Sequence, residues 1–183
     1  MKHLTGLIVG AMLAAQSAIA APMGDDGLHK PTWLRDTFKD MSEDLAEANA
    51  EGKRMLVIWE QRGCIYCRKM HEEVFPDPEI DALIRENYFV VQMNLFGDVE
   101  VTDFDGTTLS EKDMARRWGV VFTPTMMFMP EDGEGLENGG QAAVVSMPGA
   151  FGRGTTRALL MWVLEKGYEG EEHFQKYVAR VLQ

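Results

Sequence analysis

The fold is decided by residues 55–67, which read MLVIWEQRGCIYC. A continuous apolar run at residues 55–59 predicts a strand that is covered on both faces. Gly63 then breaks the chain, and residues 64–74 are expected to form a helix. Cysteines three positions apart on a helix lie on the same side, so their sulfurs can meet. This stretch therefore predicts a strand, a turn and a C-x-x-C motif that opens a helix.

The two cysteines of this motif, Cys64 and Cys67, are the only cysteines in the 183-residue chain. A helix N-terminus favours a thiolate, because unpaired N–H groups and the helix dipole stabilise negative charge there. We therefore expect Cys64 to be the attacking, more exposed sulfur and Cys67, one turn inward, to resolve the mixed disulfide. The strand before the motif and the helix after it favour redox chemistry.

Three other roles of a C-x-x-C pair compete with redox chemistry. A purely structural disulfide would close a very small loop and so add little stability. Haem attachment requires His directly after the second cysteine, and that position holds Arg68. A zinc or copper site is an open alternative, because His71 follows Cys67 by four positions on the same helix face. A closed four-ligand zinc site is not expected, since His29 and His173 lie far away in sequence.

A second motif, GVVFTPT at residues 119–125, leads into another apolar run. Pro cannot donate to a sheet ladder, so Pro124 belongs at the start of a strand. A cis bond between Thr123 and Pro124 would be a specific, retained feature of such a turn. The motif supports the redox interpretation.

The remaining pattern predicts strands that alternate with helices. Leu34, Phe38, Met41, Leu45 and Ala48 follow helical spacing and predict one face of a first helix. Further helices are expected from Asp77-Pro78, from Ser110 to Trp118-Gly119, over 153–166 and over 174–182, and further strands over 89–95, 125–129 and 143–147. This order predicts an α/β fold with a central mixed sheet of about four to five strands and helices on both faces.

Composition and length indicate one ordinary globular domain. The chain is 45% hydrophobic and 26% charged, with a formal charge of −11. An acidic chain lacks the basic footprint that nucleic acid and anionic membranes require, so both partners are excluded. We expect a flexible arm at 21–31, a single domain at 32–183 and an insert around 97–109.

Residues 1–20 have the layout of a secretory signal peptide. Lys2 precedes an apolar stretch, and the small residues Ala18 and Ala20 stand at positions −3 and −1 of a predicted cleavage site before Ala21. An uncleaved membrane anchor is the alternative, but the apolar core is short for a membrane span. We therefore expect an exported protein without stable membrane insertion, in a compartment where thiols tend to be oxidised.

The strand, C-x-x-C, helix order and the Thr-Pro before a strand resemble the thioredoxin fold over roughly residues 53–167. Within that fold, three segments resemble the periplasmic SoxW-type thioredoxins of bacterial sulfur-oxidation operons. These are WEQRGCIYC (59–67), VQMNLFGD (91–98) and VTDFDG (101–106). The resemblance implies a periplasmic protein disulfide reductase with no cofactor beyond its redox-active cysteine pair.

The resemblance also implies roles for individual residues and partners. Cys64 would be the nucleophile and Cys67 the resolving thiol. Pro124 would be the cis-proline facing them, and Thr123 would offer backbone groups to an extended substrate. Partners would be disulfide-containing periplasmic proteins, including the sulfur-oxidation machinery, and a membrane electron donor of the CcdA/DsbD type. The alternatives are an oxidase, isomerase or cytochrome c maturation thioredoxin, and a periplasmic copper or zinc chaperone.

The chain departs from typical thioredoxins at several positions. They carry a buried carboxylate six residues before the first Cys, where this chain has Ile58. Glu60 is a candidate proton acceptor in its place; the alternative is a solvated residue at the end of a strand. Gly63 replaces the usual Trp, and Ile65-Tyr66 replaces Gly-Pro between the cysteines, where residues tune the potential and contact substrate.

Two further features favour structural roles. Met126, Met127 and Met129 are expected in the core, with an adaptable binding surface or soft metal ligands as the alternative. The loop at 103–106, DFDG, has incomplete calcium-ligand spacing and is expected to be a surface turn.

Overall fold

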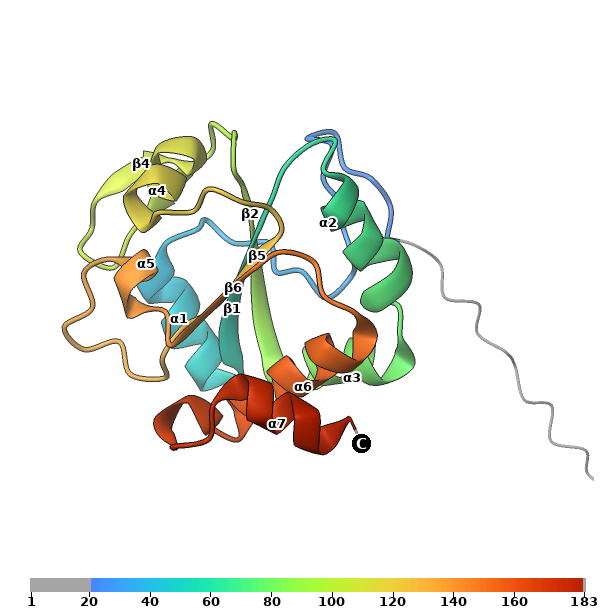
Figure 1. Cartoon of the computed structure of the whole chain (residues 1–183). Coiled ribbons are helices and arrows are strands. Elements are labelled where there is room, and N and C mark those ends of the chain that lie inside the picture. The colour runs from blue at the N-terminus through green and yellow to red at the C-terminus, as the bar shows by residue number, and fades with distance from the viewer. Residues whose placement is uncertain (1–20, 183) are drawn as a thin grey trace, which may run out of the picture.

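A four-stranded mixed sheet forms the centre of the computed structural model, which describes residues 21–182 (Figure 1). Its order is β2 (Tyr88–Asn94), β1 (Arg54–Glu60), β5 (Thr125–Phe128) and β6 (Val145–Pro148). β1 pairs in parallel with β2 and antiparallel with β5, and β5 pairs antiparallel with β6. The predicted mixed sheet is confirmed. The predicted signal peptide at 1–20 lies outside the described residues.

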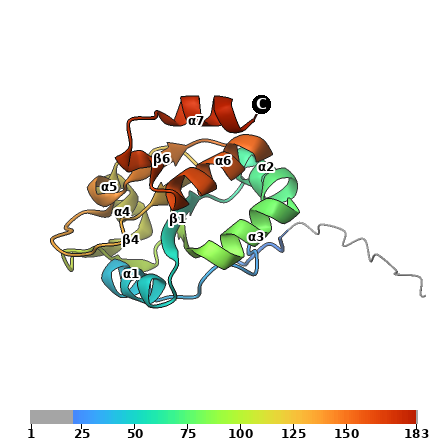
Figure 2. The same ribbon diagram turned by 90° about the horizontal axis from the view of Figure 1, so that it is seen from below.

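Helices cover both faces of the sheet (Figures 1 and 2). One face carries α2 (Ile65–Lys69), the π-helical turn η1 (Met70–Val74), α3 (Pro78–Asn87) and α6 (Arg153–Leu164). The other carries α1 (Met41–Ala50) and α4 (Glu111–Trp118). Outside these lie the β3–β4 hairpin (Glu100–Thr102 and Thr108–Ser110), the short α5 (Gly139–Ala142), the 3₁₀ turn η2 (Gly167–Glu169) and α7 (Phe174–Val181) against α6. No helix within residues 21–182 has the length and apolarity to cross a membrane.

Burial on both faces explains why β1 is an unbroken apolar run. Leu56 and Ile58 enter the core under α3 and α6, whereas Val57 and Trp59 enter the core under α1 and α4. Alternation of side chains along a strand sends successive residues to opposite faces, so both sets must be apolar. Met126, Met127 and Met129 are likewise buried, which places the methionine cluster in the core.

The helix ends follow local chemistry. Asp77 caps α3 with Pro78 in the first turn, and Ser110 caps α4, which ends at the left-handed Gly119. The prediction of a first helix from Leu34 is wrong, because α1 begins only at Met41. Lys39 has a left-handed backbone (φ 58°), and the Asp40 carboxylate accepts the amides of Ser42 and Glu43 as the N-cap. Phe38, expected on the buried face, is 96% exposed.

Two segments pack more closely than the sequence suggests. Residues 21–31, for which we predicted a flexible arm, bury Leu28 and bond through Lys30 and the His29 carbonyl to Gln92 of β2. The loop at 103–106 is not only a surface turn. Asp103 is buried and accepts hydrogen bonds from the Trp118 indole and the Gly139 amide, because it joins the hairpin to α4 and α5.

Candidate active site

A disulfide joins Cys64 and Cys67 at the N-terminus of α2, with 5.2 Å between their Cα atoms. Cys64 is the N-cap residue, and its Sγ accepts a hydrogen bond of 3.0 Å from the Cys67 amide. Cys64 is half-buried, whereas Cys67 is buried. Cys64 is thus the more exposed of the two cysteines, and a backbone donor already points at its sulfur.

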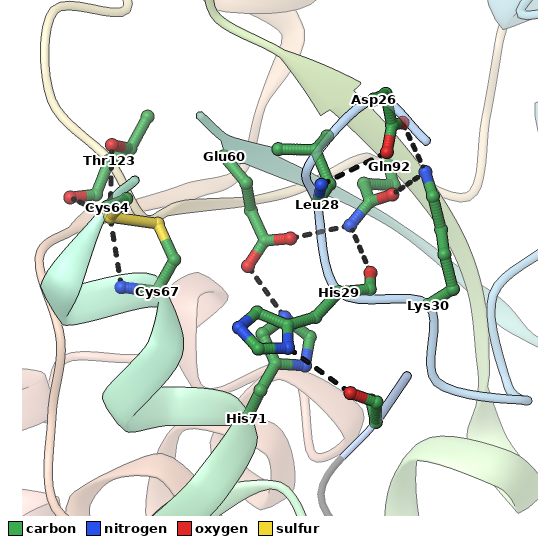
Figure 3. A network of polar contacts seen from close by, with 11 residues as sticks. Asp26, Leu28, His29, Lys30, Glu60, Cys64, Cys67, His71, Gln92 and Thr123 are labelled. Atoms are coloured by element: carbon green, nitrogen blue, oxygen red, sulfur yellow. Dashed lines mark hydrogen bonds and ion pairs between the residues drawn. A yellow bond between two sulfur atoms is a disulfide. The ribbon is translucent and has the colours of Figure 1, made fainter. Parts of the chain in front are cut away.

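Thr123 faces the disulfide from the turn before β5. The peptide bond between Thr123 and Pro124 is cis, as the sequence predicted. The Thr123 hydroxyl donates to Cys64 Sγ at 3.4 Å, and the Thr123 carbonyl oxygen lies 3.6 Å from the same sulfur (Figure 3). Pro124 is buried. The structure therefore brings together the two motifs, which are 59 residues apart in sequence.

Exposed apolar side chains flank this sulfur. Ile65 and Tyr66, between the cysteines, are 63% and 59% exposed. Val121 and Phe122, just before Thr123, are also exposed, although neither was predicted as a site residue. All four side chains belong to the two segments that contact the disulfide. The apolar sequence GVVF before Thr123 could therefore have predicted an apolar surface at the site.

Glu60 ends β1 and is buried, with 1% of its surface exposed. The interpretation as a solvated strand-end residue is wrong, because neighbouring segments enclose the carboxylate. One oxygen is 2.7 Å from His71 Nε2, and the other accepts a hydrogen bond of 2.5 Å from Gln92 Nε2. Figure 3 shows the carboxyl group between the disulfide and the His71 ring.

The polar network continues from Glu60 into the N-terminal segment. His71, on the π-helical turn, is buried and stacks on His29 with ring centroids 4.6 Å apart. Lys30 donates to the Gln92 side-chain oxygen at 2.7 Å and pairs with Asp26. Partial burial would raise the pKa of Asp26, but hydrogen bonds from Lys30 and the Leu28 amide, with the Lys30 charge, bring it below its usual value.

A cavity of about 180 Å³ adjoins the disulfide. Its walls come from three segments: the N-terminal segment with Met23, Leu28 and His29, the end of β1 with Glu60, and the start of α2 with Cys64 and Cys67. Segment 21–31 is therefore part of the site, and nothing in its irregular sequence indicated this.

The described residues hold no group of three or more His, Cys, Asp and Glu side chains placed to bind a metal ion. His71, the proposed third ligand of the metal alternative, has its Nε2 at the Glu60 carboxylate instead. The described residues therefore do not form a closed four-ligand zinc site.

Comparison with known proteins assigns the family. The sequence profile of the thioredoxin-like domain matches residues 41–143, which is more than half of the chain. The chain belongs to the thioredoxin-like family. Among curated proteins, no sequence match was found.

Known structures agree with the thioredoxin-like assignment. A thioredoxin from Thermus thermophilus is 24% identical, with a TM-score of 0.55 over 73% of this chain and 95% of its own. A thioredoxin-fold protein from Helicobacter pylori is 18% identical, with a TM-score of 0.54 over 78% of this chain and 95% of its own. At this identity the likeness concerns the fold, and it confirms the thioredoxin fold predicted from the sequence.

Proposed function

We propose that this thioredoxin-like protein is a periplasmic thiol–disulfide oxidoreductase that reduces disulfides of partner proteins. The observation that carries the proposal is the position of Cys64, the more exposed cysteine, at a helix N-terminus and against Thr123 of the cis Thr123–Pro124 turn. The Cys67 amide, 3.0 Å from that sulfur, would stabilise a Cys64 thiolate in the reduced form. The disulfide needs no cofactor beyond itself.

The reaction has two exchange steps. The Cys64 thiolate attacks one sulfur of a partner disulfide, so that a Cys64–partner bond forms and the first partner thiolate leaves. Cys67 then loses its proton and attacks Cys64 Sγ, which forms the Cys64–Cys67 bond and releases the second partner thiolate. Two electrons pass to the partner. The exposed Ile65 and Tyr66 would contact its chain, and the Thr123 backbone would pair with an extended segment.

Location and partners follow from the resemblance and from residues 1–20. An exported reductase works where thiols tend to be oxidised, so its disulfide must be recharged with electrons. A membrane donor of the CcdA/DsbD type would supply them. The sulfur-oxidation machinery of SoxW-type systems is the proposed client, because the segments around the disulfide and the insert carry that similarity.

Insulin reduction tests the chemistry. We expect the wild-type protein with dithiothreitol to reduce insulin, and Cys64→Ser to lose this activity, because the nucleophile is absent. Cys67→Ser should retain the first step and accumulate mixed disulfides. Inactive wild-type protein, or an active Cys64→Ser variant, would contradict the proposal.

The direction and the client require two more measurements. A reduction potential of about −270 mV supports a reductase, whereas one of about −120 mV would indicate an oxidase. Expressed in the native host, Cys67→Ser should hold periplasmic clients on Cys64, where they can be identified. A trap that captures sulfur-oxidation proteins supports the proposed client, and a trap that captures only other proteins overturns it.

A further inference from the structure

The cavity of about 180 Å³ beside Cys64 has a wall that neither sequence motif of the site supplies. Met23, Leu28 and His29 form this wall, whereas the end of β1 and the start of α2 form the others. The thioredoxin-like profile matches residues 41–143, so the wall lies outside the part of the chain that defines the family. The N-terminal wall is therefore an addition of this chain to the family's domain.

The cavity and the Thr123 turn lie on different sides of the disulfide. Thr123 contacts Cys64 Sγ through its hydroxyl and its carbonyl oxygen, and Figure 3 shows Thr123 on one side of the two sulfurs and Leu28 on the other. Among residues 21–182, the cavity walls include none of the residues 119–125. A partner chain that is bonded to Cys64 and paired with Thr123 therefore has a neighbouring side chain within reach of the cavity.

Both the buried and the exposed parts of the cavity walls are rich in apolar side chains. Leu28 and Cys67 are each 3% exposed, whereas Met23 and Ile65 are 58% and 63% exposed. Of the methionines between residues 21 and 182, only Met23 is exposed. Exposed apolar side chains that gather around a hollow mark a binding surface, and a methionine side chain adapts its shape to a ligand.

Two polar side chains of the walls already have partners. The two carboxylate oxygens of Glu60 are bonded to His71 and to Gln92. His29 Nδ1 lies 3.3 Å from the Ala21 carbonyl oxygen. A polar ligand group that entered the cavity would lose its water without gaining these partners, so the cavity favours an apolar occupant.

The N-terminal wall is held in place before any partner arrives. The Lys30 amide donates to the Pro22 carbonyl at 2.7 Å, which closes the segment into a loop. Arg62 donates to the Asp25 carbonyl at 3.0 Å. Gly27 has a left-handed backbone (φ 76°), and a Cβ there would lie 2.5 Å from Arg62 Nε. A wall that is already ordered loses little conformational freedom on binding, which favours affinity.

We propose that this cavity is a subsite for one apolar side chain within two residues of the partner's cysteine, and that Met23 is a specificity-determining residue. The inference rests on the proposed thiol–disulfide exchange, because a partner bonded to Cys64 delivers the side chain. Small-molecule sites enclose roughly 300–1,000 Å³. A cavity of about 180 Å³ suits a single aliphatic side chain instead.

A panel of peptides tests the subsite. Each peptide contains one cysteine, joined by a disulfide to a small fluorescent thiol, and Ala at all other positions except one. That position, from two residues before to two residues after the cysteine, holds either Leu or Asn, which have similar shapes. The rate constant with reduced protein is divided by the rate constant with dithiothreitol, so that intrinsic reactivity cancels. We expect Leu to be preferred over Asn by about 10-fold or more at one position.

Substitutions on the two sides of the disulfide locate the preference. Met23→Gln keeps the length of the side chain but removes its apolar surface, so the preference for Leu should fall to about threefold or less. Phe122→Gln is the matched control, an exposed apolar residue beside Thr123 on the other side. It should leave the preference within about twofold of wild type, because independent sites act additively.

A structural measurement complements the rates. Cys67→Ser forms a stable mixed disulfide with the preferred peptide, because the resolving thiol is absent. In NMR spectra of this complex, the Met23 methyl group should show nuclear Overhauser effects to the methyl groups of the peptide Leu.

The outcomes are distinct. If wild-type protein prefers Leu at none of the positions, the subsite is overturned. An unchanged preference in Met23→Gln, or a complex without contacts between Met23 and the peptide Leu, overturns the role of the N-terminal wall. If no peptide reacts with the protein although dithiothreitol reduces them all, the proposed function itself fails.

Discussion

At the scale of single residues, Asp44 predicts a pH dependence of stability. It is buried in the first turn of α1 and accepts a hydrogen bond of 3.0 Å from Thr37. Burial raises its pKa from 3.8 to about 6. Between about pH 4 and pH 6 the folded state therefore binds a proton that the unfolded state has lost. The stability that the protonated carboxyl contributes is present below about pH 4 and is lost as pH rises through about 6.

The substitution Asp44→Asn should remove this loss. We expect it to raise the free energy of unfolding at neutral pH by about 1–3 kcal/mol, with little gain near pH 4, because only the ionised carboxylate is penalised. Urea unfolding at both pH values measures the difference. Glu43→Gln, at an exposed site in the same turn, should change stability by less than about 0.5 kcal/mol. An equal gain from Asp44→Asn at both pH values would contradict the prediction.

Single residues also show what a sequence can predict about a site. Cys64, Cys67 and the cis Thr123–Pro124 bond were predictable because each depends on a local motif. The environment of Glu60 was not predictable from the sequence. β1 is buried on both faces, so alternation does not separate buried from solvated positions, and the partners of Glu60 come from η1 and β2.

At the scale of elements, periodic segments were predicted well and the irregular N-terminal segment was not. The strands and the capped helices repeat apolar residues or carry local cap chemistry. Residues 21–40 form no helix and hold their place through long-range contacts, such as the Arg35 amide bonded to the Val90 carbonyl at 2.9 Å. Apolar spacing across this segment imitated a helix, which is why Phe38 was placed in the core.

The N-terminal segment should therefore contribute to stability. Leu28 is 3% exposed and lines the disulfide cavity, so Leu28→Ala is expected to lower the free energy of unfolding by about 2–4 kcal/mol. Phe38→Ala removes a larger apolar side chain that is 96% exposed, and it should change stability by less than about 0.5 kcal/mol. Chemical denaturation of both variants gives the comparison. Equal effects would mean that the segment is not packed as described.

At the scale of the whole molecule, buried polar groups connect parts of the chain that the apolar cores do not. Below the disulfide, Glu60 links β1, β2 and η1. On the opposite face, Asp103 links the insert to the helices there. The apolar pattern predicted the strands and most of the helices, but it contained no information on these connections, because one carboxylate among turn residues is typical of a solvated loop.

Asp103 is expected to make the insert unfold together with the rest of the domain. Its carboxylate accepts hydrogen bonds from the Arg117 side chain at 2.7 Å, the Trp118 indole at 2.9 Å and the Gly139 amide at 3.0 Å. Asp103→Ala leaves these donors without an acceptor, so we expect a loss of about 3–5 kcal/mol. Asp105→Ala removes an exposed carboxylate that pairs with the same Arg117, and it should lower stability much less than Asp103→Ala does. In calorimetry, Asp103→Ala should shift one transition to lower temperature, because the insert unfolds with the sheet. A separate early transition, or equal effects of the two substitutions, would show that the insert folds independently of the domain.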